Sequence, residues 1–235
     1  MPDRSIRSAF WQGARDSLPF LIVVVPFGMI FGVLASEAGW TLAQTLGMSV
    51  LVIAGASQFT ALQLLADQAP LLVVIATSLA VNLRLGMYSA SLAPYLGTAP
   101  AGWRALAAYV LTDQSYGVAI QRFSRQPPLG PGEHLSYFIG CALPICFPWY
   151  VATWAGAVAG AAVPAALALD FAVPVTFIAL VAPALRSLPH LVAASVSVIV
   201  TLALAGLPYS LGLLVAALVA MAAGALVERR QERRP

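Results

Sequence analysis

Stretches of about 20 apolar residues recur along this chain and constrain its fold more than any other feature. A helix needs about 20 such residues to cross the roughly 30 Å hydrocarbon core of a bilayer. Only 9% of the 235 residues are charged and 60% are hydrophobic, whereas a soluble domain carries roughly 25% charged residues. The sequence therefore predicts an all-α, polytopic transmembrane helical bundle. Its candidate spans are 18–36, 42–66, 70–88, 104–121, 135–158, 171–185, 191–206 and 209–227.

The positions of the arginines, which are the only basic residues besides histidine, predict the orientation of these spans. If the N-terminus is cytoplasmic and eight helices alternate, ten arginines fall on the cytoplasmic side, Arg104 falls near the outer side and Arg84 lies within a span. Cytoplasmic loops of membrane proteins are enriched in arginine, so both termini are expected in the cytoplasm. Segments 171–185 and 191–206 are short and closely spaced, so seven spans with one re-entrant segment is the alternative.

A polar stretch with three prolines, 122–134, divides the apolar segments into two groups. We interpret the chain as a single transmembrane domain, 1–235. Its first half is 18–121, its cytoplasmic connector is 122–134 and its second half is 135–227. The halves share no repeat at the level of residues, but an inverted structural repeat with broken helices leaves little trace in a sequence.

Small and polar residues interrupt the second apolar segment near its middle. Gly55 tolerates unusual backbone angles, and Ser57 and Gln58 both donate and accept hydrogen bonds. A helix that breaks here exposes backbone N–H groups at a new N-terminus, which binds a carboxylate well. The alternative is a continuous helix that uses Gly55 and Ser57 for close packing. The candidate substrate-binding residues of this motif are Gly55, Ala56, Ser57 and Gln58.

Asn82 and Arg84 form a second polar cluster, in the third apolar segment. Two residues apart on a helix, they diverge by about 200°, so one pocket holds both only where the helix unwinds. Pro94 and nearby serines are compatible with such unwinding. The alternative for Arg84 is a side chain that reaches the outer interface, because the predicted span ends shortly after it.

Asp113 and Gln114 form a third polar cluster, in the middle of the fourth segment. Asp113 follows Arg104 by about 13 Å at 1.5 Å per residue, which is close to the bilayer centre. An aspartate there costs about 2.5–3.5 kcal/mol on insertion scales and needs a cation, a proton or water. Its candidate partners are Arg84, the ammonium group of a substrate and a transported proton. A purely structural ion pair between Asp113 and Arg84 is the alternative.

Other classes of function find little support in the sequence. Cys141 and Cys146 point in different directions on a helix, and no Cys/His spacing is typical of a metal site, so we predict no disulfide, metal or cofactor. The arginines are not interleaved with aromatic residues as on a nucleic-acid-binding surface. An intramembrane serine hydrolase built on Ser57 requires a nearby base. However, the chain has no lysine, and His134 and His190 are expected in loops.

The three polar clusters resemble motifs of the AzlC family, the large subunits of branched-chain amino acid exporters named for azaleucine resistance. The matching stretches run in the same order over nearly the whole chain. They are LPFLIVVVPFGMIFGVLA (18–35), AGASQF (54–59), NLR (82–84) with SLAPYL (91–96), LTDQSYGVA (111–119) and FIALVAPALRSLP (177–189). The family's motif positions correspond to Gly55, Ser57, Gln58, Asn82, Arg84 and Asp113.

The resemblance implies a permease of the bacterial inner membrane that exports branched-chain or similar small apolar amino acids. Such proteins typically use the proton gradient and act with a separate small membrane subunit of the AzlD type. The family commonly has Arg-His where this chain has Arg84-Leu85, and Asp-Glu where it has Asp113-Gln114. Because two titratable groups are absent, proton coupling and the exact substrate stay open.

Physics and resemblance together give one mechanistic hypothesis. The carboxylate of an amino acid meets the broken helix at 55–58, assisted by Arg84 or Asn82, and its ammonium meets Asp113. The apolar side chain rests among aromatic residues such as Phe27, Phe31, Phe59 and Tyr116. The alternatives are a channel, whose flux does not saturate, and a membrane scaffold that transports nothing.

Overall fold

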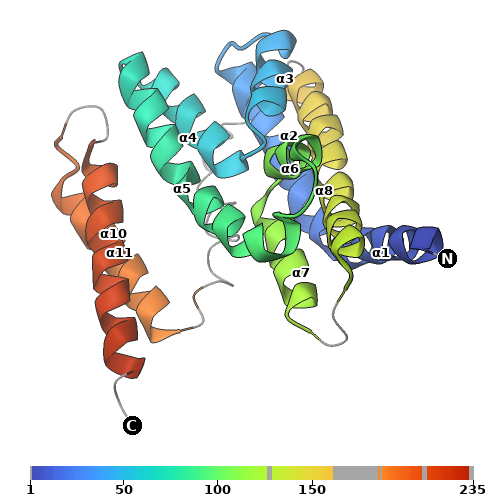
Figure 1. The fold of residues 1–235 in the computed structure, drawn as a ribbon. Coiled ribbons are helices and arrows are strands. Elements are labelled where there is room, and N and C mark those ends of the chain that lie inside the picture. Colours follow the sequence, from blue (N-terminus) through green and yellow to red (C-terminus); the bar gives the residue numbers. More distant parts are fainter. Residues whose placement is uncertain (1, 126–128, 161–184, 186, 208–210, 233–235) are drawn as a thin grey trace. The chain divides into compact units, whose positions relative to one another are not determined.

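The computed structural model describes residues 2–125, 129–160, 185, 187–207 and 211–232, and within these ranges every regular element is a helix (Figure 1). The all-α prediction is therefore confirmed. Contacts group the chain into two compact units: Met1–Phe59 with Val81–Leu167, and Thr60–Ala80 with Ala168–Pro235. The prediction of one domain stays a prediction. The elements before the second half are α1 (Pro2–Ser17), η1 (Leu18–Phe20), α2 (Leu21–Glu37), α3 (Leu42–Leu51), α4 (Gly55–Ala66), α5 (Leu71–Leu96), α6 (Ala101–Tyr109) and α7 (Asp113–Phe123).

Three helical stretches within the described ranges are long and apolar enough to cross a membrane. They are Ser5–Glu37, Leu71–Leu96 and Gly132–Gly160. The number of spans stays a prediction, and the candidate span 171–185 lies outside the described residues.

Two of the candidate spans are each interrupted. The segment 42–66 consists of α3 and α4 with a break at 52–54, and the segment 104–121 consists of α6 and α7 with a break at 110–112. The expectation of broken helices is confirmed, and the first break falls beside Gly55 as proposed. The second was not foreseen. Each half-helix has 9 to 12 residues, too few to cross a bilayer alone.

Glycines allow α2 to pack closely against α8 (Pro131–Gly160), so that the two helices lie side by side (Figure 1). Each helix contributes two glycines with the spacing of a GxxxG motif, Gly28 and Gly32 on α2 and Gly156 and Gly160 on α8. Gly28 lies against Trp149 and Ala152 of α8, and Gly160 lies against Val33 of α2. A Cβ at Gly32 would overlap the backbone carbonyl of Thr153, and one at Gly156 would overlap that of Met29. This backbone-to-backbone contact sets the position of the long helices.

The helix α1 crosses α8 in the same way. Gly13 lies against the carbonyl of Tyr137, and Gly140 lies against the carbonyl of Phe10. The Tyr137 hydroxyl also donates a hydrogen bond to Asp16, at 2.6 Å. The N-terminal segment is therefore an ordered helix that is bound to α8.

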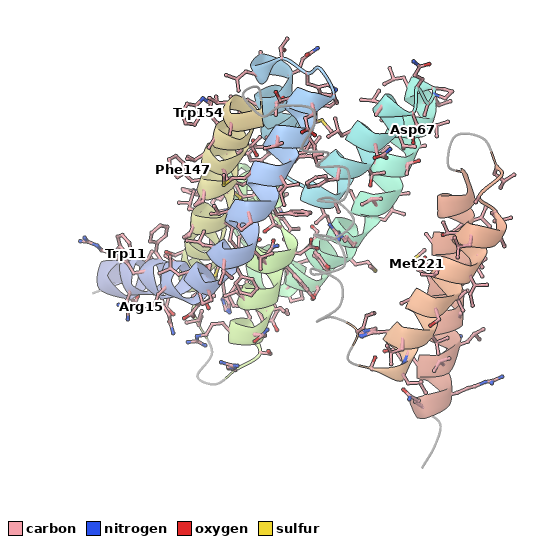
Figure 2. The ribbon with its side chains drawn as sticks, turned by 180° about the vertical axis from the view of Figure 1, so that it is seen from behind. Trp11, Arg15, Asp67, Phe147, Trp154 and Met221 are labelled. Carbon is pink, nitrogen blue, oxygen red and sulfur yellow. The ribbon has the colours of Figure 1, made fainter. Side chains whose placement is uncertain are left out.

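The face of α8 that points away from α2 carries large apolar side chains. Phe147 is 68% exposed and Trp154 is 50% exposed, and Figure 2 shows both projecting from the helix. Leu143, Val151 and Val158 continue this row at spacings of three and four residues. Such a row is expected where a helix faces lipid or another membrane protein.

Aromatic contacts show that α6 and α7 form a reversal. The chain enters α6 next to the end of α5, and it leaves α7 at the same end of α5. Tyr95, in the last turn of α5, contacts the rings of Phe123 at the end of α7 and His134 at the start of α8, with centroids 5.0 and 5.3 Å apart. At the other end of the pair, the Val110 carbonyl accepts from the thiol of Cys146, which lies in the middle of α8. The segment 101–123 is thus a helical hairpin, and its prediction as one crossing helix is wrong.

In the second unit, α10 (Leu188–Ala203) packs against α11 (Leu211–Glu232). Gly224 permits the close approach, because a Cβ there would lie 3.2 Å from that of Ala193. These helices match the candidate spans 191–206 and 209–227. His190 lies in α10 and His134 lies in α8, so the expectation that both occupy loops is wrong.

Candidate functional site

Gln58 stabilises the break between α3 and α4 with its side-chain amide. Its Nε2 donates to the carbonyl of Val52, where the backbone is extended, and lies 3.4 Å from the carbonyl of Met48. The Met48 carbonyl also accepts the backbone N–H of Val52, whereas the Val52 carbonyl follows the last turn of α3 and has no further turn to satisfy it. Gln58 is fully buried, and its Oε1 has no hydrogen-bond partner among the described residues. The amide therefore has a structural role and also presents one buried acceptor.

Aromatic rings surround the first turn of α4. A Cβ at Gly55 would lie 2.8 Å from Phe27 and 2.9 Å from Trp149, so only glycine fits this position without displacement of a ring. Phe59 packs on Phe27 and on Phe31, with centroids 4.7 and 5.5 Å apart. Three of the four aromatic residues predicted around a substrate side chain are thus joined through Phe59, beside Gly55.

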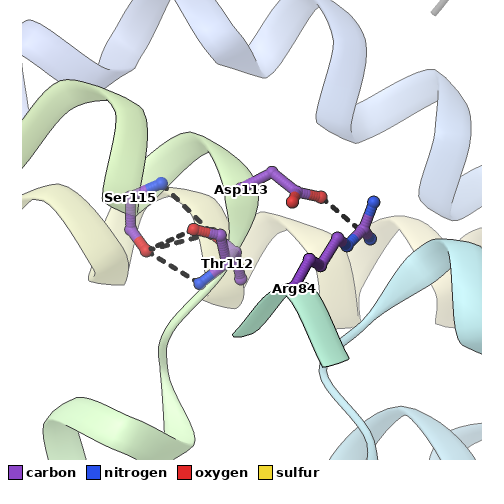
Figure 3. Close-up of polar contacts among 4 residues, drawn as sticks. All are labelled: Arg84, Thr112, Asp113 and Ser115. Atoms are coloured by element: carbon purple, nitrogen blue, oxygen red, sulfur yellow. Dashed lines mark hydrogen bonds and ion pairs between the residues drawn. The ribbon is translucent and has the colours of Figure 1, made fainter. Parts of the chain in front are cut away.

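A capping box starts α7 directly after the second break. Thr112 is the N-cap, its hydroxyl accepts from the backbone N–H of Ser115, and the Ser115 hydroxyl accepts from the backbone N–H of Thr112 (Figure 3). Because both hydroxyls are buried, these bonds fix the break inside the protein. Asp113 then occupies the first turn, where a helix N-terminus stabilises negative charge.

Asp113 forms an ion pair with Arg84 across the space between α7 and α5. Arg84 Nη2 lies 3.0 Å from Asp113 Oδ2 (Figure 3), and the side chains are 32% and 42% exposed. Because α5 extends from Leu71 to Leu96, Arg84 is near its middle, and the predicted span end soon after it is wrong. The alternative that the Arg84 side chain reaches the outer interface depended on that span end, so the structure does not support it. Its Nε has no hydrogen-bond partner among the described residues.

Two tyrosines adjoin this ion pair. Tyr88, one turn after Arg84 on α5, interacts electrostatically with both Arg84 and Asp113. Its ring stacks on Tyr116 at a centroid distance of 4.1 Å, and the Tyr116 hydroxyl lies 3.1 Å from Ser91 Oγ. Tyr116 was predicted beside Phe27, Phe31 and Phe59; its stacking and hydrogen-bond partners are instead on α5.

A third tyrosine joins the two breaks. The Tyr109 hydroxyl, at the end of α6, donates to the carbonyl of Val50 near the end of α3, at 2.6 Å. It also lies 3.3 Å from the hydroxyl of Tyr150 on α8. The ends of both interrupted helices are therefore tied to each other and to α8.

The structure thus brings together part of the predicted site. Arg84 and Asp113 are paired, whereas Ser57 is fully buried beside Gln58, in the first turn of α4. Asn82 is half-buried, and its Oδ1 is buried without a hydrogen-bond partner among the described residues. Ala56 and Gln114 are half-buried in the first turns of α4 and α7. The roles of all eight residues in binding a substrate stay predictions.

Sequence reasoning missed three residues at these breaks. Thr112 and Ser115 have the three-residue spacing of a capping box, which was a readable signal for a helix start at Asp113. Trp149 beside Gly55 comes from α8, and nothing in its local sequence indicates that partner.

The fold and these breaks define an integral membrane protein with interrupted helices and an ion pair in the middle of a long helix, features of membrane transport proteins. Comparison with known proteins identifies the group: the family described as AzlC protein matches residues 19–163, more than half of the chain. The chain belongs to the AzlC family, and the resemblance seen in its motifs is confirmed.

Curated relatives are membrane proteins as well. The inner membrane protein YgaZ of Escherichia coli is 28% identical over 180 residues, which cover 74% of this chain and 72% of YgaZ. An uncharacterized membrane protein of Archaeoglobus fulgidus is 29% identical over 190 residues, 79% of this chain and 80% of the relative. No solved structure matches the chain.

Proposed function

We propose that this chain is the large subunit of a bacterial inner-membrane permease that exports branched-chain or similar small apolar amino acids. The export is coupled to protons and requires a small membrane subunit of the AzlD type. The observation that carries the proposal is the ion pair between Arg84 and Asp113, held beside the break that starts α7. Membership of the AzlC family supports the assignment to transport.

An amino-acid zwitterion carries the same two charges as this ion pair. Its ammonium competes with Arg84 for the Asp113 carboxylate, and its carboxylate competes with Asp113 for the guanidinium. Such an exchange keeps every charge paired, which matters because an ionised side chain inside a membrane segment is costly. A proton on Asp113 releases Arg84 in the same way, which gives proton movement a route to the same switch.

The apolar part of the substrate is assigned to the aromatic cluster around Gly55, formed by Phe27, Phe31 and Phe59. The buried, unpartnered Oε1 of Gln58 provides an acceptor in the same turn of α4. An apolar pocket separates substrates that differ by one methylene by only about 1–3 kcal/mol. We therefore expect leucine, isoleucine, valine and methionine to compete for export.

Efflux of leucine from cells loaded with a leucine-containing dipeptide tests this proposal. We expect efflux only when the chain and its small subunit are co-expressed, with saturation at high leucine and loss when a protonophore collapses the gradient. Flux that neither saturates nor needs a gradient would indicate a channel. The absence of flux both with and without the small subunit would indicate a scaffold.

Asp113→Asn, compared with Asp67→Asn, tests the role of the carboxylate. Asp67 is an exposed aspartate that follows α4 and accepts a side-chain hydrogen bond from Gln63, at 3.2 Å. Export is expected to fall to background in Asp113→Asn and to stay unchanged in Asp67→Asn. If Asp113→Asn keeps both export and its pH dependence, the assigned role is wrong.

A further inference from the structure

A crevice of about 190 Å³ lies between α5 and α6, separate from the ion pair. Its floor is apolar and buried, and a guanidinium lies on its rim. The floor consists of Leu92, Leu96, Ala107, Leu111 and Phe138, and the rim carries Arg104. The residues of α5 and of α6 each recur at helical spacing, so two facing helix sides form its walls.

The rim of the crevice lies at the end where the α6–α7 hairpin begins. Arg104 Nη1 donates to the carbonyl of Gly97, directly after α5, at 3.3 Å. Tyr95, two residues earlier, contacts the end of α7 and the start of α8. Arg104 therefore lies at the same end as the segment that contains Arg122 and Arg125.

This end carries several arginines, so the positive-inside rule assigns it to the cytoplasm. The expectation that Arg104 lies near the outer surface rested on one crossing helix over 104–121, which the hairpin replaces. With Arg104 on the cytoplasmic side, the orientation agrees better with the rule than the one deduced from the sequence.

We propose that this crevice binds an anionic phospholipid of the cytoplasmic leaflet. One acyl chain lies along Leu92, Leu96 and Ala107, and the phosphate accepts hydrogen bonds from the Arg104 guanidinium. Basic pockets between membrane helices on the cytoplasmic side suit such headgroups, and a guanidinium forms strong, often bidentate bonds to phosphate. Arg104 forms no ion pair within the described part of the chain, and its bond to Gly97 is long.

Charge favours a lipid over an amino acid in this crevice. The carboxylate of an amino acid would find Arg104, but its ammonium would find no acidic side chain, because the lining holds no Asp or Glu. A phospholipid such as phosphatidylglycerol needs only the cation and the apolar floor.

Native mass spectrometry of the full chain tests the proposal. The purified protein is mixed with equal amounts of dioleoylphosphatidylglycerol and dioleoylphosphatidylcholine. We expect one phosphatidylglycerol bound in preference by about fivefold, the effect of one basic residue near a membrane surface. Arg104→Gln should remove the preference. Arg104→Lys should keep most of it, which separates lost charge from lost fold. Arg125→Gln is the matched control, because Arg125 is exposed at the same end but does not line the crevice.

A second variant tests the acyl-chain position. Ala108 is exposed on the crevice wall, so Ala108→Phe fills the crevice with little disturbance of the buried floor. Both lipids should then bind less. The proposal fails if the preference survives Arg104→Gln, if Arg125→Gln removes it equally, or if Ala108→Phe leaves both adducts intact. Displacement of the lipid by millimolar leucine would also overturn it, since the crevice would then be an amino-acid site.

Discussion

The glycine contacts between α2 and α8 predict that replacement of glycine by alanine lowers stability at Gly32 of α2 and raises it at Gly47 of α3. Gly32→Ala places a Cβ against the carbonyl of Thr153 and 2.6 Å from the backbone nitrogen of Ala157. Backbone atoms cannot rotate away, so the two helices must separate. Gly47→Ala, in the interior of α3, places its Cβ where no atom lies within 4 Å.

The expected magnitudes follow from these two environments. Overpacking costs about 1–3 kcal/mol, and contact with two backbone groups places Gly32→Ala near the upper end of that range. Replacement of glycine by alanine within a helix contributes about 1 kcal/mol of stability in both variants. We therefore expect a net loss of about 2 kcal/mol for Gly32→Ala and a gain of about 1 kcal/mol for Gly47→Ala.

Thermal unfolding of the purified variants, followed by tryptophan fluorescence in one detergent, measures this difference. Gly32→Ala should lower the midpoint and Gly47→Ala should raise it. The assigned packing of α2 on α8 would be refuted if both variants shifted the midpoint in the same direction by the same amount.

Three further predictions concern the two breaks and the α6–α7 hairpin. Thr112→Ala removes the cap of α7 and should reduce stability by about 1 kcal/mol in the same unfolding assay, whereas exposed Thr98 should tolerate alanine; equal effects would contradict the capping role. Tyr109→Phe removes the hydrogen bond to Val50 and should cost about 1 kcal/mol, and an unchanged midpoint would show that this bond does not stabilise the fold. Thr98→Cys and Ser124→Cys should react with a membrane-impermeant thiol reagent from the same side of oriented vesicles. Reaction from opposite sides would disprove the hairpin. The buried Cys141 and Cys146 should stay unlabelled.

The fold class and the first break were predictable because they depend on local signals. Apolar length and low charge identify membrane helices, and Gly55 with two polar neighbours marks a weak point in a helix. The same local signals gave approximate bounds for α2, α8, α10 and α11.

The path of the chain was harder to predict than its helices. A helical hairpin and a single crossing helix have the same apolar content, so hydropathy does not distinguish them. The decisive observation is the contact of Tyr95 with Phe123 and His134, which is a contact between residues distant in sequence. The Thr112 and Ser115 spacing marked the second break, but only together with that contact does it show a reversal.

The sequence predicts which residues form the candidate site better than it predicts how they are arranged. An arginine and an aspartate in apolar segments must find partners, so their pairing was foreseeable from cost alone. The hydrogen bond from Gln58 to the Val52 carbonyl was not foreseeable, because it depends on the geometry of a break that the sequence does not define.

In the proposed mechanism, the charges of Arg84 and Asp113 take part in transport and do more than hold α5 and α7 together. The single substitution Asp113→Asn removes the carboxylate and also leaves Arg84 without its partner, so the double variant Arg84→Gln with Asp113→Asn is the direct test. Its leucine efflux is measured at matched abundance in the membrane, with the small subunit present. We expect a folded protein whose efflux falls to that of cells without the chain. Efflux equal to that of the unaltered protein would show that the ion pair is only structural.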